Sequence, residues 1–198
     1  MQYRFDFLED LPWRPKLPER LFFCLVPDRG AAAKIARFSA GYRRENAIQG
    51  EVLKPERLHV SLHHVGDYKR LPTQKVYAAE RAADVILGQA FEVTFSAVGS
   101  FRPPPARGGM EPKHPLVLLA DADALQPLHK ALGEAMRRQG LGASDHFKPH
   151  MTLAYCPENA PFQPIGPIRF KAAAITLIHS ERGLGRYHEK GRWPLGAG

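Results

Sequence analysis

The first half of the chain carries an apolar pattern that predicts three strands and two helices. Residues 21–26 form a short continuous apolar run, which is typical of a buried strand. A helix with Asp28 as its N-cap follows, because apolar residues then recur at helical spacing: Ala32, Ile35, Phe38 and Tyr42. Residues 58–65 and 91–98 alternate and are predicted as strands, and residues 73–87 between them are predicted as a helix.

The second half of the chain repeats this order. Residues 116–120 are predicted as an apolar strand, and Asp121 and Asp123 offer an N-cap for the helix after it. The apolar stripe of that helix consists of Leu125, Leu128, Leu132 and Met136. Residues 148–155 alternate and are predicted as a strand, and two more strands are expected at 173–180 and 186–193.

The repeated order predicts an internal duplication. We expect an N-terminal arm over residues 1–20 and one bilobal domain over 21–198, with pseudo-repeats at about 21–98 and 116–195. Residues 99–115, rich in proline and glycine, read as a long surface loop between the repeats. The predicted fold class is α+β, with two similar lobes related by a pseudo-twofold axis around a central groove.

Composition narrows the class of protein. The hydrophobic fraction of 44% and the charged fraction of 24% are typical of a folded soluble domain. The formal net charge of +8 favours an anionic partner such as nucleic acid, although many basic proteins bind none. Two cysteines cannot make a disulfide framework, and neither a signal peptide nor a membrane-spanning run is visible. We therefore expect a cytoplasmic monomer.

Two short motifs stand at equivalent places in the two repeats. They are His59-Val60-Ser61-Leu62 and His150-Met151-Thr152-Leu153. On a strand, His59 and Ser61 share one face, as do His150 and Thr152, while the residues between them point to the core. With this composition, chance gives about 0.05 matches to such a motif, so two equivalent copies indicate a function.

The motifs and their flanks resemble the 2H phosphoesterase superfamily, which is defined by two His-x-Thr/Ser-x motifs. Within it the chain resembles most the RNA 2′,3′-cyclic phosphodiesterases, also called 2′-5′ RNA ligases (the LigT-like family). The stretches Phe147–Ala154 and Lys54–Leu62 carry the resemblance, with Ser61 where threonine is commoner. The resemblance extends from about residue 21 to 195, and it implies two lobes, each an antiparallel sheet with outer helices, with the motifs lining the central groove.

What the resemblance implies for chemistry is hydrolysis of an RNA 2′,3′-cyclic phosphate to a 2′-phosphate, without metal or cofactor. His59 is expected to donate a proton to the leaving ribose oxygen, and His150 to accept one from water. Ser61 and Thr152 are expected to bind the non-bridging phosphate oxygens. The reverse reaction would form a 2′-5′ linkage.

Other residues are candidates for substrate contacts. Lys148 shares the face of His150 and could meet a phosphate, as could Arg102 and Arg107 if the loop folds over the groove; solvated positions are equally compatible with all three. Phe101 and Tyr155 could each stack a base, although the core is the expected place for Tyr155. Simple alternation also places His63 on the same face as His59. His146 and His150 have zinc-like spacing, but Pro149 opposes a helix there, so we expect no metal.

Two other functions remain open at this stage. The same chemistry could act on a small cyclic nucleotide or a 2′,5′-oligonucleotide. Alternatively, the chain could be a non-catalytic RNA-binding module, a class that would favour exposed aromatic residues on sheet faces. The retention of both histidines and both hydroxyls favours the enzyme.

Overall fold

The computed structural model describes residues 14–103 and 112–196. This part of the chain forms three α-helices, one short 3-10 helix and nine strands. In chain order these are β1 (Glu19–Leu25), α1 (Arg29–Glu45), β2 (Glu51–Val52), η2 (Pro55–Arg57), β3 (Val60–Tyr68), α2 (Thr73–Asp84), β4 (Phe91–Ser100), β5 (His114–Ala120), α3 (Gln126–Arg138), β6 (His150–Cys156), β7 (Gln163–Ala172), β8 (Ala174–Glu181) and β9 (Arg186–Pro194).

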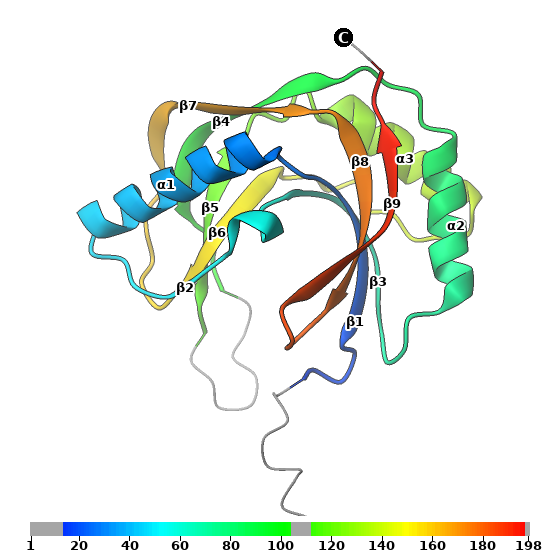
Figure 1. Cartoon of the computed structure of the whole chain (residues 1–198), viewed down its shortest axis with the longest axis horizontal. Coiled ribbons are helices and arrows are strands. Elements are labelled where there is room, and N and C mark those ends of the chain that lie inside the picture. The colour runs from blue at the N-terminus through cyan, green and yellow to red at the C-terminus, as the bar shows by residue number, and fades with distance from the viewer. Residues whose placement is uncertain (1–13, 104–111, 197–198) are drawn as a thin grey trace, which may run out of the picture.

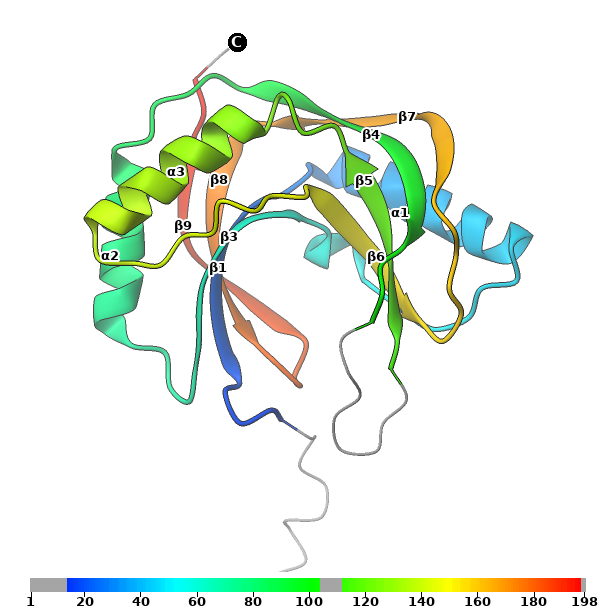
Figure 2. The same ribbon diagram turned by 180° about the vertical axis from the view of Figure 1, so that it is seen from behind.

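The strands form one curved antiparallel sheet with the order β7-β4-β5-β6-β3-β1-β8-β9, and β2 pairs with β6 beside this path. The order has a centre between β6 and β3. On each side of it a motif strand is followed by the first strand of its own repeat, β5 or β1, and then by β4 or β8. Figures 1 and 2 show the resulting arch, with one lobe on each side. The predicted fold class is thereby confirmed.

Two of the helices pack against the lobe opposite to the one whose strand precedes them in the chain. Helix α1 follows β1, yet it packs near β7 in the other lobe, and α3 follows β5 but packs against β3. Helix α2 contacts α3, β8 and β9. Helix α1 lies in front of β5 and β6 in Figure 1, helix α3 lies on the opposite side of the molecule, in front of β8 and β9 in Figure 2, and α2 lies at the outer edge in both views.

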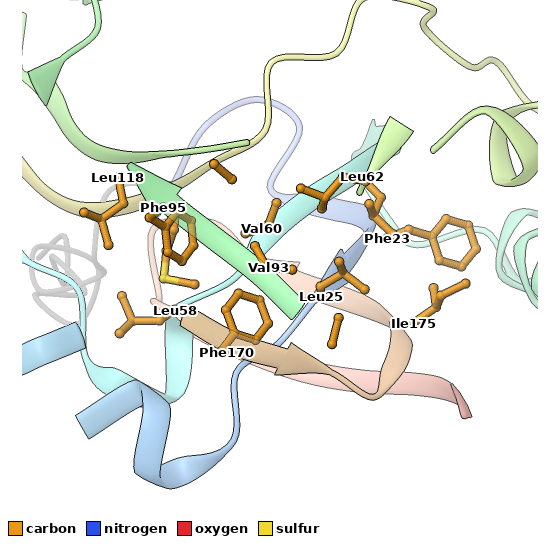
Figure 3. Packing of buried hydrophobic residues seen from close by; sticks show 14 of the residues in the cluster. Phe23, Leu25, Leu58, Val60, Leu62, Val93, Phe95, Leu118, Phe170 and Ile175 are labelled. Atoms are coloured by element: carbon orange, nitrogen blue, oxygen red, sulfur yellow. The ribbon is translucent and has the colours of Figure 1, made fainter. Parts of the chain in front are cut away.

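The hydrophobic core lies on the helix side of the sheet and continues through both lobes. Phe23 and Leu62 from one lobe and Phe95 and Leu118 from the other belong to the same buried cluster (Figure 3). Val60 of the first histidine motif is fully buried in this cluster. Burial of the residues between the motif side chains therefore fixes the orientation of His59 and Ser61.

Most predicted elements are confirmed, with local differences. Asp28 caps α1, and its Oδ1 accepts a hydrogen bond of 2.9 Å from the backbone N–H of Ala31. The predicted cap of the third helix was wrong, because α3 begins after Leu125 without a side-chain cap. Helix α2 ends at Asp84, three residues before the predicted end at Leu87, and the side chain of Leu87 is 95% exposed.

The strands that border the predicted loop and the predicted arm are longer than expected, so both segments are shorter than predicted. Strand β4 extends to Ser100 and β5 begins at His114, so pairing between these strands shortens the loop. Strand β1 begins at Glu19, two residues before the expected boundary. Residues 1–13 of the arm and 104–111 of the loop lie outside the described part. Strand β7, at the edge of the sheet, was not predicted at all.

Candidate active site

The two histidine motifs meet where the lobes join. Within the described residues, β3 and β6 pair at one position, Val60 opposite Met151. Both residues are fully buried, so the residues before and after each of them project to the other face of the sheet. His59, Ser61, His150 and Thr152 all line one cleft of about 560 Å³ on that face.

Both motif strands contain a β-bulge at the same motif position. In β3, Ser61 and His63 pair with neighbouring residues of β1, so Leu62 is the extra residue. In β6, Thr152 and Ala154 pair with neighbouring residues of β5, so Leu153 is the extra residue. The leucine of each His-x-Ser/Thr-Leu motif is therefore the bulge residue, and side-chain alternation shifts by one after it.

The bulges determine which later side chains reach the cleft. Leu62 and His63 are both buried, as are Leu153 and Ala154, and the next residue of each strand, His64 or Tyr155, lines the cleft. Two expectations based on simple alternation were therefore wrong. His63 does not share the face of His59, and Tyr155 lies in the cleft with 41% of its surface exposed rather than in the core.

Each motif histidine is held in the same way by the backbone two residues before it. Nδ1 of His59 lies 2.8 Å from the carbonyl oxygen of Arg57, and Nδ1 of His150 lies 2.7 Å from that of Lys148. A carbonyl oxygen only accepts hydrogen bonds, so Nδ1 carries the proton in both neutral rings. This leaves Nε2 of each ring as the nitrogen that can take up or release a proton.

Aromatic and basic side chains flank both histidines. The ring of His59 lies 5.0 Å from that of Phe22 and 5.8 Å from that of Tyr187, and the ring of Phe101 lies 4.9 Å from that of His150. These rings are half-buried or buried, and they restrict the contact of both imidazoles with water.

The basic residue that precedes each histidine by two also lies over one of these aromatic rings. The guanidinium of Arg57 is 4.7 Å from the ring centre of Tyr187, and Nζ of Lys148 is 4.7 Å from that of Phe101. Such cation–π contacts hold a positive charge beside each histidine.

These surroundings lower the pKa of both histidines. Burial lowers the pKa of His59 to about 4, and the charge of His150 acts in the same direction, although the hydrogen bond to the carbonyl of Arg57 partly opposes it. Burial also lowers the pKa of His150, with a further contribution from the charge of Lys148. Both rings are therefore neutral at pH 7 in the free protein, and a bound anion would favour their protonated forms.

The far wall of the cleft is an ion-pair network around Asp67. Arg20 binds both carboxylate oxygens of Asp67 at 2.7 and 2.8 Å, and Arg182 and His64 each contact the same carboxylate at 3.0 Å. The side chains of Arg20, Arg182 and His64 line the cleft, as do those of two acidic residues, Glu51 and Glu181. Burial raises the pKa of the Asp67 carboxyl, but the hydrogen bonds from Arg20 and His64 outweigh burial and hold this pKa well below its usual range.

The predicted substrate residues lie in different places. Phe101 and Lys148 lie together beside His150, but outside the residues that line the cleft. Arg102 is exposed and does not line the cleft either, and Arg107 lies outside the described residues.

Arg57 lines the cleft and was not predicted, although the argument used for Lys148 applies equally to a basic residue two positions before His59. Its buried Nε has no hydrogen-bond partner among the described residues. In the same part of the chain, no three His, Cys, Asp or Glu side chains gather as a metal site. No helix described there has both the length and the apolar character needed to cross a membrane.

Solved structures similar to this chain share its fold. TT0787 of Thermus thermophilus matches with a TM-score of 0.67 and 21% identity over 90% of this chain and 98% of its own. E. coli LigT in its apo form matches with a TM-score of 0.68 and 23% identity over the same shares of the two chains. LigT complexed with 3′-AMP matches with a TM-score of 0.65 and 23% identity, over 90% of this chain and 99% of that one.

Sequence comparison identifies the family. None of the curated proteins matches the sequence. The family model described as the 2′-5′ RNA ligase superfamily matches residues 26–184, a range that contains both histidine motifs and most of the strands that build the cleft. The chain therefore belongs to the 2′-5′ RNA ligase superfamily of 2H phosphoesterases.

Proposed function

We propose that the protein is a metal-independent phosphodiesterase that opens a 2′,3′-cyclic phosphate at the end of an RNA or oligonucleotide and leaves a 2′-phosphate. The observation that carries this proposal is that the two histidines have equivalent surroundings. Each has its Nδ1–H bonded to a backbone carbonyl, each is accompanied by a hydroxyl, and all four side chains line one cleft. An acid and a base on one phosphate need this arrangement.

The hydrolysis needs two proton transfers. His150 takes a proton from water at Nε2 as the water oxygen forms a bond to phosphorus. The bond from phosphorus to the ribose 3′-oxygen breaks, and that oxygen takes a proton from Nε2 of His59. If a 5′-hydroxyl attacks phosphorus in place of water, the same two proton transfers consume a 2′,3′-cyclic phosphate and form a 2′-5′ linkage, so ligation requires no nucleotide cofactor.

The proposed acid requires a substrate-dependent change in protonation. With a pKa of about 4, His59 is neutral in the free protein at pH 7. The negative charge of a bound phosphodiester stabilises the imidazolium and raises this pKa. Ser61 and Thr152 donate hydrogen bonds to the non-bridging oxygens, where negative charge accumulates in the transition state.

The substrate class rests on the charge and on the family. The chain carries 28 lysine and arginine residues against 20 acidic ones. Among its relatives in fold, LigT has been solved in complexes with 3′-AMP and with phosphate. A basic chain whose cleft offers arginine, hydroxyl and imidazole groups suits a nucleotide phosphate, and we therefore favour RNA ends over other phosphodiesters.

The testing experiment is an assay of the purified protein on two substrates. Adenosine 2′,3′-cyclic phosphate and an oligonucleotide ending in a cyclic phosphate are incubated separately, and the 2′- and 3′-phosphate products are resolved. We expect 2′-phosphates from both. Formation of 3′-phosphates, or no turnover of either, would overturn the proposal.

Salt dependence separates the two enzyme candidates. An oligonucleotide makes more phosphate contacts with a basic protein than a mononucleotide does, so its KM should rise more steeply with salt through counterion release. Equal salt dependence of both substrates would favour the small-nucleotide alternative. Salt-sensitive RNA binding without turnover would favour the binding-module alternative.

A further inference from the structure

The ring of Tyr155 is an exposed aromatic surface inside the cleft. Tyr155 is 41% exposed, and it lines the same cleft as His59, His150 and Thr152. Its equivalent in the other repeat, His64, is bound to Asp67 through Nε2 at a distance of 3.0 Å. The two bulges thus place His64 and Tyr155 at matching positions of the two repeats. His64 is already bound to Asp67, whereas the ring of Tyr155 is exposed in the cleft.

The backbone fixes Tyr155 from two sides. In the sheet it pairs with Pro115 of β5 and with Glu51 of β2. Gly50, which precedes β2, has φ of +122°, and a side chain at this position would collide with the carbonyl oxygen of Tyr155. Only glycine permits this close approach of the two backbones. These contacts fix the backbone from which the ring of Tyr155 projects into the cleft.

The charged groups of this wall already have partners. Arg20 and Arg182 bind Asp67, and Glu181 binds His188 at 3.1 Å. One face of Tyr187 is covered by the guanidinium of Arg57. The ring of Tyr155 is therefore the surface in this part of the cleft best suited to a flat, uncharged group.

The position of Tyr155 along β6 matches the size of a nucleotide. Because Leu153 is a bulge residue, Thr152 pairs with Val117 and Tyr155 with Pro115, two residues apart on β5. This corresponds to about 7 Å at the usual rise of a strand. A phosphate bound between the histidines and Thr152 would place its attached nucleoside over this length of β6.

We propose that Tyr155 stacks on the nucleobase of the terminal nucleotide whose phosphate lies between His59 and His150. This inference rests on the proposed function for the place of the phosphate. Stacking on an aromatic ring accepts every base, so Tyr155 selects for a nucleotide over other phosphate esters and not for a particular base.

Equilibrium binding tests the inference independently of turnover. The dissociation constants of adenosine 2′-phosphate and of glycerol 2-phosphate, which carries a similar phosphate without a base, are measured by calorimetry. Tyr155→Ala should weaken the nucleotide roughly 5- to 150-fold, the range for loss of one base–aromatic stack. Its effect on glycerol 2-phosphate should stay within about 2-fold, and Tyr155→Phe should bind both compounds like the wild type.

Tyr77→Ala is the matched control, because Tyr77 is an exposed tyrosine on the outer helix α2. It should leave both dissociation constants unchanged. Equal weakening of both compounds by Tyr155→Ala, unchanged nucleotide binding in that variant, or failure of the wild type to bind the nucleotide would each overturn the inference. If only the proposed function is wrong, the protein should still bind adenosine 2′-phosphate, and Tyr155→Ala should still weaken that binding, but a cyclic phosphate should not be turned over.

Discussion

The imidazole rings of His63 and His129 stack in the core with their centres 3.9 Å apart, and Nε2 of His63 donates to the carbonyl oxygen of His129 at 2.8 Å. Phe147 extends the stack on the other side of His129, at 4.1 Å. Burial lowers the pKa of both histidines, that of His129 to about 4. His63 belongs to β3, four residues after His59.

The first prediction is a loss of stability at mildly acidic pH. Between pH 6.5 and 4 the unfolded chain protonates His129, whereas the folded protein does not, and the lowered pKa of His63 acts in the same direction. The unfolding free energy should therefore be fully present above pH 6.5 and fall as the pH decreases, by about 1.4 kcal/mol for each unit by which a pKa is lowered. Urea unfolding at pH 7.5 and at pH 5 measures the difference.

Two variants test the origin of this loss. His129→Phe keeps a ring in the stack but removes one titrating group, so its stability should depend less on pH over this range. His146→Gln changes an exposed histidine and should retain the wild-type dependence. An unchanged slope in His129→Phe would assign the acid sensitivity to other groups.

The second prediction concerns the catalytic histidines. His59→Ala and His150→Ala each remove a proton-transfer group and should lower turnover roughly 10²- to 10⁴-fold. Because both act on one transition state, the double variant should be little slower than either single variant. Initial rates on adenosine 2′,3′-cyclic phosphate measure this, and near wild-type activity in either single variant would remove that residue from the mechanism.

The third prediction concerns the motif hydroxyls. Ser61→Ala and Thr152→Ala remove a donor to the phosphate without removing an acid or a base. Turnover should fall by up to about 10²- to 10³-fold for a main oxyanion contact, and by less if a neighbouring donor such as Arg57 compensates. Thr152→Ser keeps the hydroxyl and should restore most of the rate, whereas Thr152→Val should not.

The fourth prediction is a bell-shaped pH dependence of kcat/KM with its maximum below pH 6.5. The base must be neutral and the acid protonated, and the pKa values of both histidines are lowered in the free protein. The rate should fall toward high pH as the acid loses its proton and toward low pH as the base gains one. A maximum at alkaline pH would be incompatible with this pair of histidines.

The fifth prediction is that chelation leaves the activity unchanged. The proposed proton transfers involve histidines and water alone. Dialysis against EDTA should not alter turnover of the cyclic phosphate, and added zinc or manganese should not raise it. A chelated protein that is inactive until metal is restored would contradict the mechanism.

The site could be predicted from the sequence to the extent that it depends on local pattern. Alternation correctly places His59 and Ser61 on one face, because Val60 must be buried. The pattern could not reveal that Leu62 and Leu153 are bulge residues, since a bulge depends on pairing with β1 or β5. The faces of His63 and Tyr155 were therefore predicted wrongly, although the residues themselves were noted.

The missed strand has a similar explanation. Strand β7 contains Pro164, Gly166 and Pro167, which argue against a strand in isolation. It lies at the edge of the sheet and pairs with β4 alone in the main strand order, so its free side tolerates residues that cannot donate. Strand β7 also pairs with the part of β4 that contains the buried residues Val93 and Phe95. This pairing joins segments far apart in sequence, so the periodicity of either segment cannot predict it.

The exchange of helices between the lobes has a consequence for how the chain reaches this structure. Helix α1 completes the lobe of β7, and α3 completes the lobe of β3, so neither lobe is fully packed while the other half of the chain is unfolded. The stabilising contacts join segments far apart in sequence, and their formation is delayed by the entropy of closing long loops. We expect the polypeptide to fold slowly and in one cooperative transition, without a stable half-molecule as an intermediate.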